Sequence, residues 1–278
     1  MGRHLRCVWL LAVALIAVAG DSAFADVALE YRWSPGGGVS RASVSLTPGR
    51  LRVDIQAGAR SISLLFDGAA RRLWVVDHAR RSYVEVGDDD LRQIRQVRER
   101  MEVQLSQLPP GAREQMERMM TPPGFSRVET APRDLCEAPR VVGTETVQGV
   151  PARIVEGCRS LAGARWVSCR FWVAEGRAVG LGPEEFRVMA GFADFFLDLV
   201  RTVGLPAALE GGDLLVHPRP ERFGELGVDF PVVVKAARIE DGRQTATMIL
   251  DRFSRDPLPD AVFTVPQGYE RITLSLPR

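Results

Sequence analysis

Few side chains in this sequence have the types and spacing that chemistry requires. Only two histidines, His78 and His217, lie beyond residues 1–25. His78 follows Asp77 at a turn between two short β patterns, where a serine would complete a Ser-His-Asp arrangement for nucleophilic catalysis. No G-x-S-x-G motif accompanies it, and a histidine at a turn is usually exposed to solvent. Hydrolysis through His78 is therefore the weakest of three functional hypotheses.

The spacing of possible ligands supports neither a metal nor a cofactor. The carboxylates of residues 88–90 point in three directions on a helix, and they suit the start of that helix better than a metal. Met116, Met119 and Met120 would suit a soft copper site or an adaptable lipid surface, but ordinary core packing explains them more simply. Zinc needs clustered His, Cys or Glu ligands, and the sequence has no such cluster.

Residues 1–25 have the features of an export signal. Two arginines precede an apolar run at residues 8–19, and Ala23-Phe24-Ala25 matches an A-x-A cleavage site. The apolar run is too short for a comfortable membrane span. We therefore expect a mature chain that starts at Asp26, spans no membrane and resides in the periplasm.

Charge excludes two classes of partner. The chain carries 36 Lys and Arg residues against 35 Asp and Glu residues, and removing the export signal brings the two into balance. A chain without a basic excess has no general electrostatic attraction to nucleic acid or to an anionic membrane surface.

Short runs of alternating apolar and polar residues predict a curved antiparallel sheet. Three such runs, residues 61–66, 72–76 and 82–86, follow one another with turn signals between them. We count about ten or eleven strands in all, with a short edge strand expected at residues 262–265. This number suits an incomplete β-barrel. No long linker divides the chain, so we expect one domain over residues 26–278.

Two stretches have helical periodicity. Residues 88–108 carry an apolar stripe, and a second short helix at residues 113–120 follows a Pro-Pro-Gly break. Residues 88–121 should therefore form an αα-hairpin inserted after the three short strands. Residues 183–203 form a further apolar helix with too many charges for a membrane span. This helix either fills the mouth of the curved sheet or closes over an apolar cavity as a lid.

Three cysteines remain after export, and an oxidising compartment favours a disulfide. Residues 153–159 and 165–173 suit a hairpin that sets Cys158 opposite Cys169, so we predict that bridge. Pairing with Cys136 is the alternative.

The order of several short motifs resembles the LolA/LolB-type lipoprotein-carrier superfamily. The fuller pattern is similar to an uncharacterised domain-of-unknown-function family of exported bacterial proteins. The resemblance implies an incomplete antiparallel barrel closed by helices, whose concave face takes acyl chains. Those carriers start with a helix, whereas this mature chain starts with a strand. The motifs are Pro48-Gly49-Arg50-Leu51-Arg52-Val53, Phe66-Asp67-Gly68, Leu73-Trp74-Val75, Asp77-His78 through Tyr83, residues 143–151, and the tail from Leu258-Pro259-Asp260 through Phe263 to Gly268-Tyr269.

Arg52 is the residue that this resemblance singles out. In those carriers an arginine on the corresponding strand bonds toward the helical lid and holds the ligand-free form closed. The other interpretation is an arginine that faces outward from an alternating strand. The residues expected around a ligand are Arg52, Trp74, Met189, Phe192, Phe195, Phe196 and Leu199.

The leading hypothesis is a periplasmic, non-enzymatic binding protein that holds an apolar or lipid-like ligand between the sheet and the 183–203 helix. It predicts a cavity larger than the protein's own side chains can fill. The alternative is a structural or envelope-assembly module with a self-filled core, whose αα-hairpin docks a protein partner. That alternative predicts exposed methionines at residues 116–120 beside a solid core.

Overall fold

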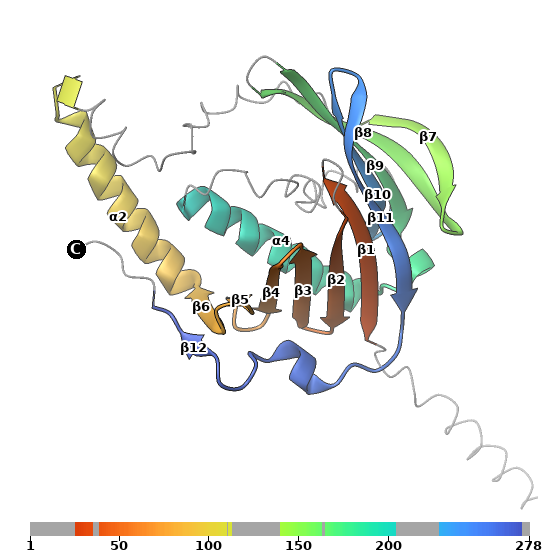
Figure 1. The fold of residues 1–278 in the computed structure, drawn as a ribbon, viewed down its shortest axis with the longest axis horizontal. Helices are drawn as coiled ribbons and strands as arrows, with labels where there is room; N and C mark the ends of the chain where they lie inside the picture. The colour runs from red at the N-terminus through yellow and green to blue at the C-terminus, as the bar shows by residue number, and fades with distance from the viewer. Residues whose placement is uncertain are drawn as a thin grey trace, which may run out of the picture.

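The described residues form a single curved sheet of twelve strands, with the helices beside it (Figure 1). The computed structural model describes residues 26–35, 39–109, 111–112, 140–162, 165–203 and 228–273. The strand order is β12-β6-β5-β4-β3-β2-β1-β11-β10-β9-β8-β7, and the two end strands do not pair with each other. The predicted α+β incomplete barrel is therefore confirmed, with twelve strands instead of ten or eleven.

The strands and helices lie close to their predicted positions. The strands are β1 (Val27–Pro35), β2 (Ser40–Thr47), β3 (Arg50–Ala57), β4 (Arg60–Asp67), β5 (Arg72–Asp77), β6 (Ser82–Gly87), β7 (Arg140–Val147), β8 (Val150–Ala162), β9 (Arg165–Glu175), β10 (Pro231–Glu240), β11 (Arg243–Ser254) and β12 (Glu270–Arg271). The helices are α2 (Asp88–Ser106) and α4 (Pro183–Val203), with 3₁₀ turns η1 (Gly176–Val179) and η2 (Asp260–Phe263).

Several predictions fall on residues outside the described ranges. These are the export signal at residues 1–25, the second helix of the αα-hairpin at residues 113–120, Cys136 and His217. They stay predictions.

The first half of the sheet has a concave face on which α4 packs. Cross-strand pairing from β2 to β6 aligns one apolar side chain per strand into a first row, and all five members are buried. Phe66 contacts the rings of Phe192 and Phe195 of α4, with centroids 5.8 and 5.6 Å apart. The apolar stripe of α4 therefore covers this row. The first row is Leu46, Leu51, Phe66, Leu73 and Val86.

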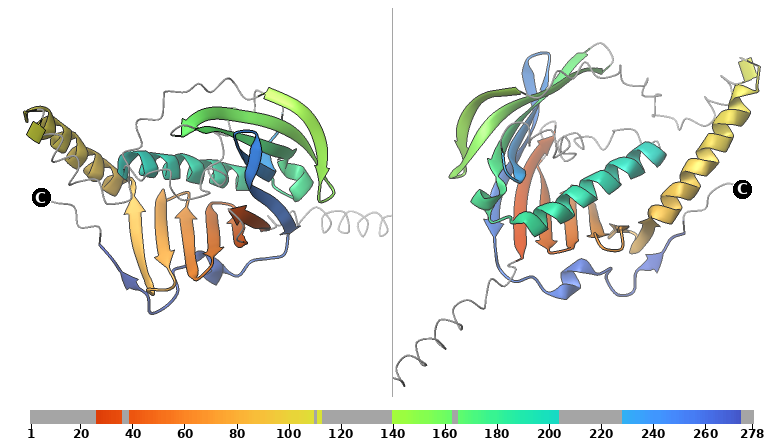
Figure 2. Two further views of the ribbon diagram at one scale, coloured as in Figure 1. Left: turned by 45° about the horizontal axis from the view of Figure 1, so that its top comes forward. Right: turned by 180° about the vertical axis from the view of Figure 1, so that it is seen from behind.

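Helix α2 leaves the sheet directly after β6. The N-cap is Gly87 and not Asp88, and the Gly87 N–H donates to Asp90 Oδ2 at 2.8 Å, so one of the three carboxylates satisfies a backbone donor at the helix start. Further along, Arg95 and Asp198 form an ion pair of 3.1 Å between α2 and α4. Beyond this contact α2 extends away from the sheet (Figures 1 and 2).

The C-terminal part of the chain lies on the opposite side of the first half of the sheet from α4 (Figure 2). We call residues 255–273 the C-terminal strap. The edge strand expected at residues 262–265 is wrong, because η2 occupies part of that segment. The strap instead ends in β12, which pairs parallel to β6 through Glu270 and Ser82. Backbone N–H groups of Glu270 and Ile272 donate to the carbonyls of Arg81 and Tyr83 at 2.9 and 2.8 Å.

The predicted disulfide lies at an irregularity of the β8–β9 pairing. Glu156 pairs with Arg170 and Arg159 pairs with Ser168, with a register shift between them, so the shift lies opposite Cys169. The Cys158 side chain is outside the described part of the chain. The Cys158–Cys169 bridge therefore stays a prediction.

Candidate functional site

The concave face beyond α4 carries apolar side chains that are only half-buried. Two further rows cross β2–β6 beside the first row and continue away from the helix. Burial decreases along this direction, from a buried first row to mostly half-buried side chains in the second and third rows. We call the half-buried apolar members the concave patch: Val44, Ile55, Ile62, Leu64, Val75 and Val84.

Helix α4 contributes apolar side chains of two kinds. Phe195 and Leu199 are buried, with Phe195 fully inaccessible. Met189, Phe192 and Phe196 are only half-buried, and the rings of the two phenylalanines stack with centroids 5.7 Å apart. Because Phe192 also contacts Phe66, which lies two residues from Leu64 on the same strand face, this edge of α4 borders the concave patch.

Arg52 and Trp74 do not join the five predicted helix residues. Both lie on the outer face of the sheet, where Arg52, Leu65 and Trp74 are cross-strand partners. The Arg52 guanidinium donates to the Val262 carbonyl of the strap at 2.7 Å and bonds Asp54 at 2.8 Å. The arginine thus faces outward and bonds toward the strap, so the expectation that it bonds toward a helical lid is wrong for this chain. Alternation along β3 dictates this, since Leu51 and Val53 point to the concave side.

A chain of hydrogen bonds links the outer face to the strap. Because the Asp54 carboxylate can only accept, the Ser63 hydroxyl donates to it. Ser63 Oγ then accepts from His78 Nε2 at 2.6 Å, and a further hydrogen bond of 3.0 Å joins His78 Nδ1 and the Tyr269 hydroxyl. Because the Ser63 hydroxyl donates to Asp54, His78 Nε2 must carry a proton. His78 was expected to be exposed at its turn, but it is partly buried and forms hydrogen bonds with Ser63 of β4 and Tyr269 of the strap.

This network contains Asp, Ser and His but not in the order of a nucleophilic triad. Ser63 lies between the carboxylate and the imidazole, whereas a triad places the histidine between the serine and the carboxylate. Ser63 is also only 1 % exposed, too little to meet a substrate. Asp77, the neighbour of His78 in sequence, accepts the Arg80 backbone N–H at 3.0 Å instead. The geometry supports a structural role.

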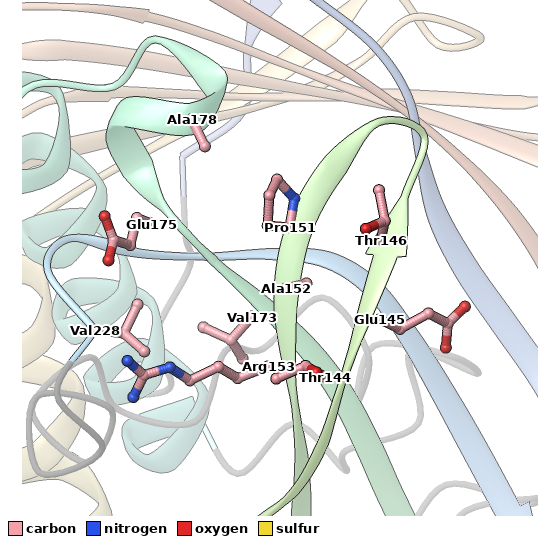
Figure 3. Close-up of a pocket in the computed structure, with 10 residues that line it drawn as sticks. All are labelled: Thr144, Glu145, Thr146, Pro151, Ala152, Arg153, Val173, Glu175, Ala178 and Val228. Atoms are coloured by element: carbon pink, nitrogen blue, oxygen red, sulfur yellow. The ribbon is translucent and has the colours of Figure 1, made fainter.

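A pocket of about 590 Å³ lies on the other half of the sheet, under β7–β9 and beside η1 (Figure 3). Its lining mixes two threonines and opposite charges, Arg153 and Glu175, with small apolar residues. That composition does not suit an acyl chain, which needs a mostly apolar lining. The lining residues are Thr144, Glu145, Thr146, Pro151, Ala152, Arg153, Val173, Glu175, Ala178 and Val228.

Glu145, at the rim of that pocket, is held by two donors. Lys235 Nζ donates to Oε1 at 3.0 Å and Trp172 Nε1 to Oε2 at 2.6 Å. The bond from Lys235, followed by that from Trp172, lowers the pKa of Glu145 below its ordinary value. The Lys235 ammonium also lies 4.0 Å from the Trp172 ring centroid. These contacts hold the side chains of Glu145, Trp172 and Lys235 together on the outer face of the second half of the sheet, which consists of β7–β10.

Sequence reasoning missed two polar aromatic residues on the concave face of β1. Tyr31 and Trp33 are both buried, and burial raises the pKa of Tyr31 far above its ordinary value. Within the described ranges, the Trp33 indole N–H has no hydrogen-bond partner. A buried indole usually finds an acceptor. The aromatic pair at alternate positions of the first strand was the signal available in the sequence.

Two classes of site receive no support from the described residues. No group of three His, Cys, Asp or Glu side chains is arranged to hold a metal ion in this part of the chain. Neither α2 nor α4 combines the length and apolar character that crossing a membrane requires, as judged over the same residues.

Comparisons with known proteins agree only weakly with this fold. No family model matches the chain, and no curated protein matches it either. A solved structure of an uncharacterized conserved protein from Thermus thermophilus is 9 % identical, with a TM-score of 0.43 over 94 % of this chain and 98 % of that one.

Two further solved structures have lower scores. MucB, in its complex with MucA from Pseudomonas aeruginosa, is 10 % identical, with a TM-score of 0.37 over 85 % of this chain and 54 % of that one. LprF from Mycobacterium bovis is 10 % identical, with a TM-score of 0.28 over 87 % of this chain and 89 % of that one. Similarities at this level do not assign a function, and the LolA/LolB resemblance stays an expectation.

Proposed function

We propose that this chain is a non-enzymatic binding protein of the cell envelope that takes an apolar, chain-like ligand on the concave patch beside α4. The observation that supports this proposal is the gradient of burial across the concave face. The first row is sealed by the helix, whereas neighbouring apolar side chains on the same strands keep part of their surface in water. A monomeric protein seldom leaves a contiguous apolar surface of this kind without a use for it.

Apolar surface is the source of affinity in this proposal. Covering the patch removes its remaining area from water, which contributes about 25 cal/mol per Å². The half-buried edge of α4, with Met189, Phe192 and Phe196, supplies a second apolar wall. The bent sheet and this edge would hold an elongated chain along the rows, and no catalytic group is needed.

The first test is native mass spectrometry of residues 26–278 recovered from an exporting host, followed by organic extraction and lipid analysis. We expect a stoichiometric acyl-chain ligand. The apo protein should then bind a fluorescent fatty acid. A Val75→Ser/Val84→Ser double variant should lose about tenfold or more in affinity, because it places two hydroxyls in the path of the chain.

The matched control is Val141→Ser/Val142→Ser, which changes the same residue types on β7. Those valines are 43 % and 46 % exposed and lie far from the patch along the sheet order. This control should bind the fatty acid as the parent protein does. An equal loss in both variants, with circular dichroism unchanged, would contradict the assignment of the patch.

A second candidate function is protein docking by a module with a self-filled core. It is favoured by Phe195, which is fully buried against the first row where an enclosed cavity was expected. A clean apo mass together with no uptake of added fatty acid would favour docking over ligand binding.

A further inference from the structure

A basic pocket lies at the end of the concave patch farthest from α4. It measures about 400 Å³ and is formed where the β3–β4 turn meets the β5–β6 turn. The His78 backbone N–H donates to the Ser61 carbonyl at 3.1 Å and holds the two segments together. The lining residues are Arg60, Ser61, Ile62, Asp77, Ala79 and Arg80.

Ile62 belongs to both the pocket and the concave patch. It is the cross-strand partner of Ile55 and lies two residues from Leu64 on the same face of β4. An apolar chain that follows the patch away from α4 therefore reaches the pocket directly. The pocket is large enough for a small polar group, given that ligand pockets commonly span about 300–1,000 Å³.

The charges of the pocket favour an anion. Two guanidinium groups face one carboxylate, that of Asp77. Asp77 is already engaged, because Oδ1 accepts the Arg80 backbone N–H and Oδ2 lies 3.8 Å from Arg80 Nε. Arg60 makes no ion pair within the part of the chain that the structure describes. Guanidinium groups bind phosphate and carboxylate oxygens through paired N–H donors.

We infer that this pocket takes the anionic headgroup of an amphiphile whose chain lies on the concave patch. The inference rests on the proposed function and adds to it the class of ligand: a single-chain or multi-chain amphiphile with a phosphate or carboxylate head. Arg60 and Arg80 bind the head, and Val44, Leu64, Val75 and their neighbours bind the chain.

The test compares two amphiphiles with the same chain. Palmitoyl lysophosphatidylglycerol has an anionic phosphodiester head, whereas monopalmitoylglycerol has a neutral head without a phosphate, and both are used below the concentrations at which they aggregate on residues 26–278. We expect the anionic amphiphile to bind about tenfold more tightly, since two charge-assisted contacts are involved. An Arg60→Gln/Arg80→Gln variant should lose this preference and keep the affinity for the neutral amphiphile.

Two control variants sharpen the comparison. Arg41→Gln/Arg243→Gln removes the same charge from exposed positions outside the pocket, so it should keep the preference. Asp77→Asn keeps an acceptor for the Arg80 N–H while removing the opposing charge, so it should increase the preference. Glycerol 3-phosphate, which has a charged head and no chain, should compete poorly at equal concentration.

Each outcome decides between the proposals. Equal binding of the two amphiphiles, or a preference retained in Arg60→Gln/Arg80→Gln, overturns the headgroup site and leaves the apolar binding function standing. Failure of both amphiphiles to bind overturns the two together. Competition by glycerol 3-phosphate as strong as by the lysolipid shows a small-anion site that is independent of the patch, and this also overturns the inference.

Discussion

The apolar side chains on the two faces of strands β2–β6 are covered in different ways. On the outer face, Leu65 and Val76 are buried, and Arg52 and His78 form hydrogen bonds with Val262 and Tyr269 of the strap. On the concave face, α4 seals one row and leaves most side chains of the next two rows half-buried. The outer face is closed by the chain itself, whereas the concave face keeps apolar surface available. Under the proposed function, strand alternation assigns stability to the outer face and binding to the concave face.

The sharpest test uses two adjacent leucines of β4 that face opposite sides. Leu65 is 1 % exposed on the outer face, and Leu64 is half-buried on the concave face. Leu65→Ala should lower the free energy of unfolding by about 2–5 kcal/mol, the usual cost of emptying a buried leucine site. Leu64→Ala should cost less than half as much, because its side chain is partly in water in the folded state. Urea unfolding measures both.

Ligand binding should reverse that order. Leu64→Ala should weaken the binding of a fluorescent fatty acid, and Leu65→Ala should leave it unchanged at temperatures where the variant is folded. Comparable effects of the two variants on both stability and binding would break the distinction between the faces.

Arg52 should act on the strap and not on the ligand. Arg52→Leu removes the donor to the Val262 carbonyl and leaves the partly buried Asp54 without its guanidinium partner. We expect a loss of about 1–3 kcal/mol in the free energy of unfolding, with more rapid hydrogen exchange at the Glu270 and Ile272 amides. Ligand retention should not change. Faster ligand loss at unchanged stability would return Arg52 to the lid role expected from the family resemblance.

The smallest effect should come from the outer face of the second half of the sheet, where the polar contacts are exposed. The pKa of Glu145 is lowered by its bonds from Lys235 and Trp172. A carboxyl whose pKa is lowered on folding stabilises the fold above its unfolded pKa, and this contribution is lost as pH falls through the folded value. Glu145→Gln should therefore lower the thermal midpoint slightly at pH 7. The difference should vanish on the acid side of the folded pKa, and a constant difference at every pH would contradict this origin.

Local patterns predicted the strands and α4 well, because alternation and helical periodicity directly reflect which side chains are buried. Helix α4 runs from Pro183 to Val203, as the periodicity indicated. The strap was not predicted, because it binds mainly through backbone groups and isolated side chains such as Phe263 and Tyr269, which leave no periodic signal. The tail motif in the family resemblance did contain both residues.

The proposed site follows from the sequence only in part. The aromatic stripe of α4 predicts Met189, Phe192 and Phe196 as ligand contacts, which stays a prediction, and alternation alone cannot say how much of a sheet face a helix covers. The concave patch therefore followed only from the packing of α4 at one end of the rows. Arg52 was misplaced because the resemblance suggested its role, whereas the strand positions of Arg52 and Trp74 put both side chains on the outer face.

The strap also makes the order of synthesis matter for folding. The Leu258 N–H donates to Asp26 at 2.6 Å, and the two residues are 232 positions apart in the chain. Until that segment has emerged, the edge of β6 lacks its β12 partner. Contacts of such long sequence separation form late and slowly. A chain whose strap has not yet emerged therefore carries a free strand edge, the condition under which chains associate wrongly.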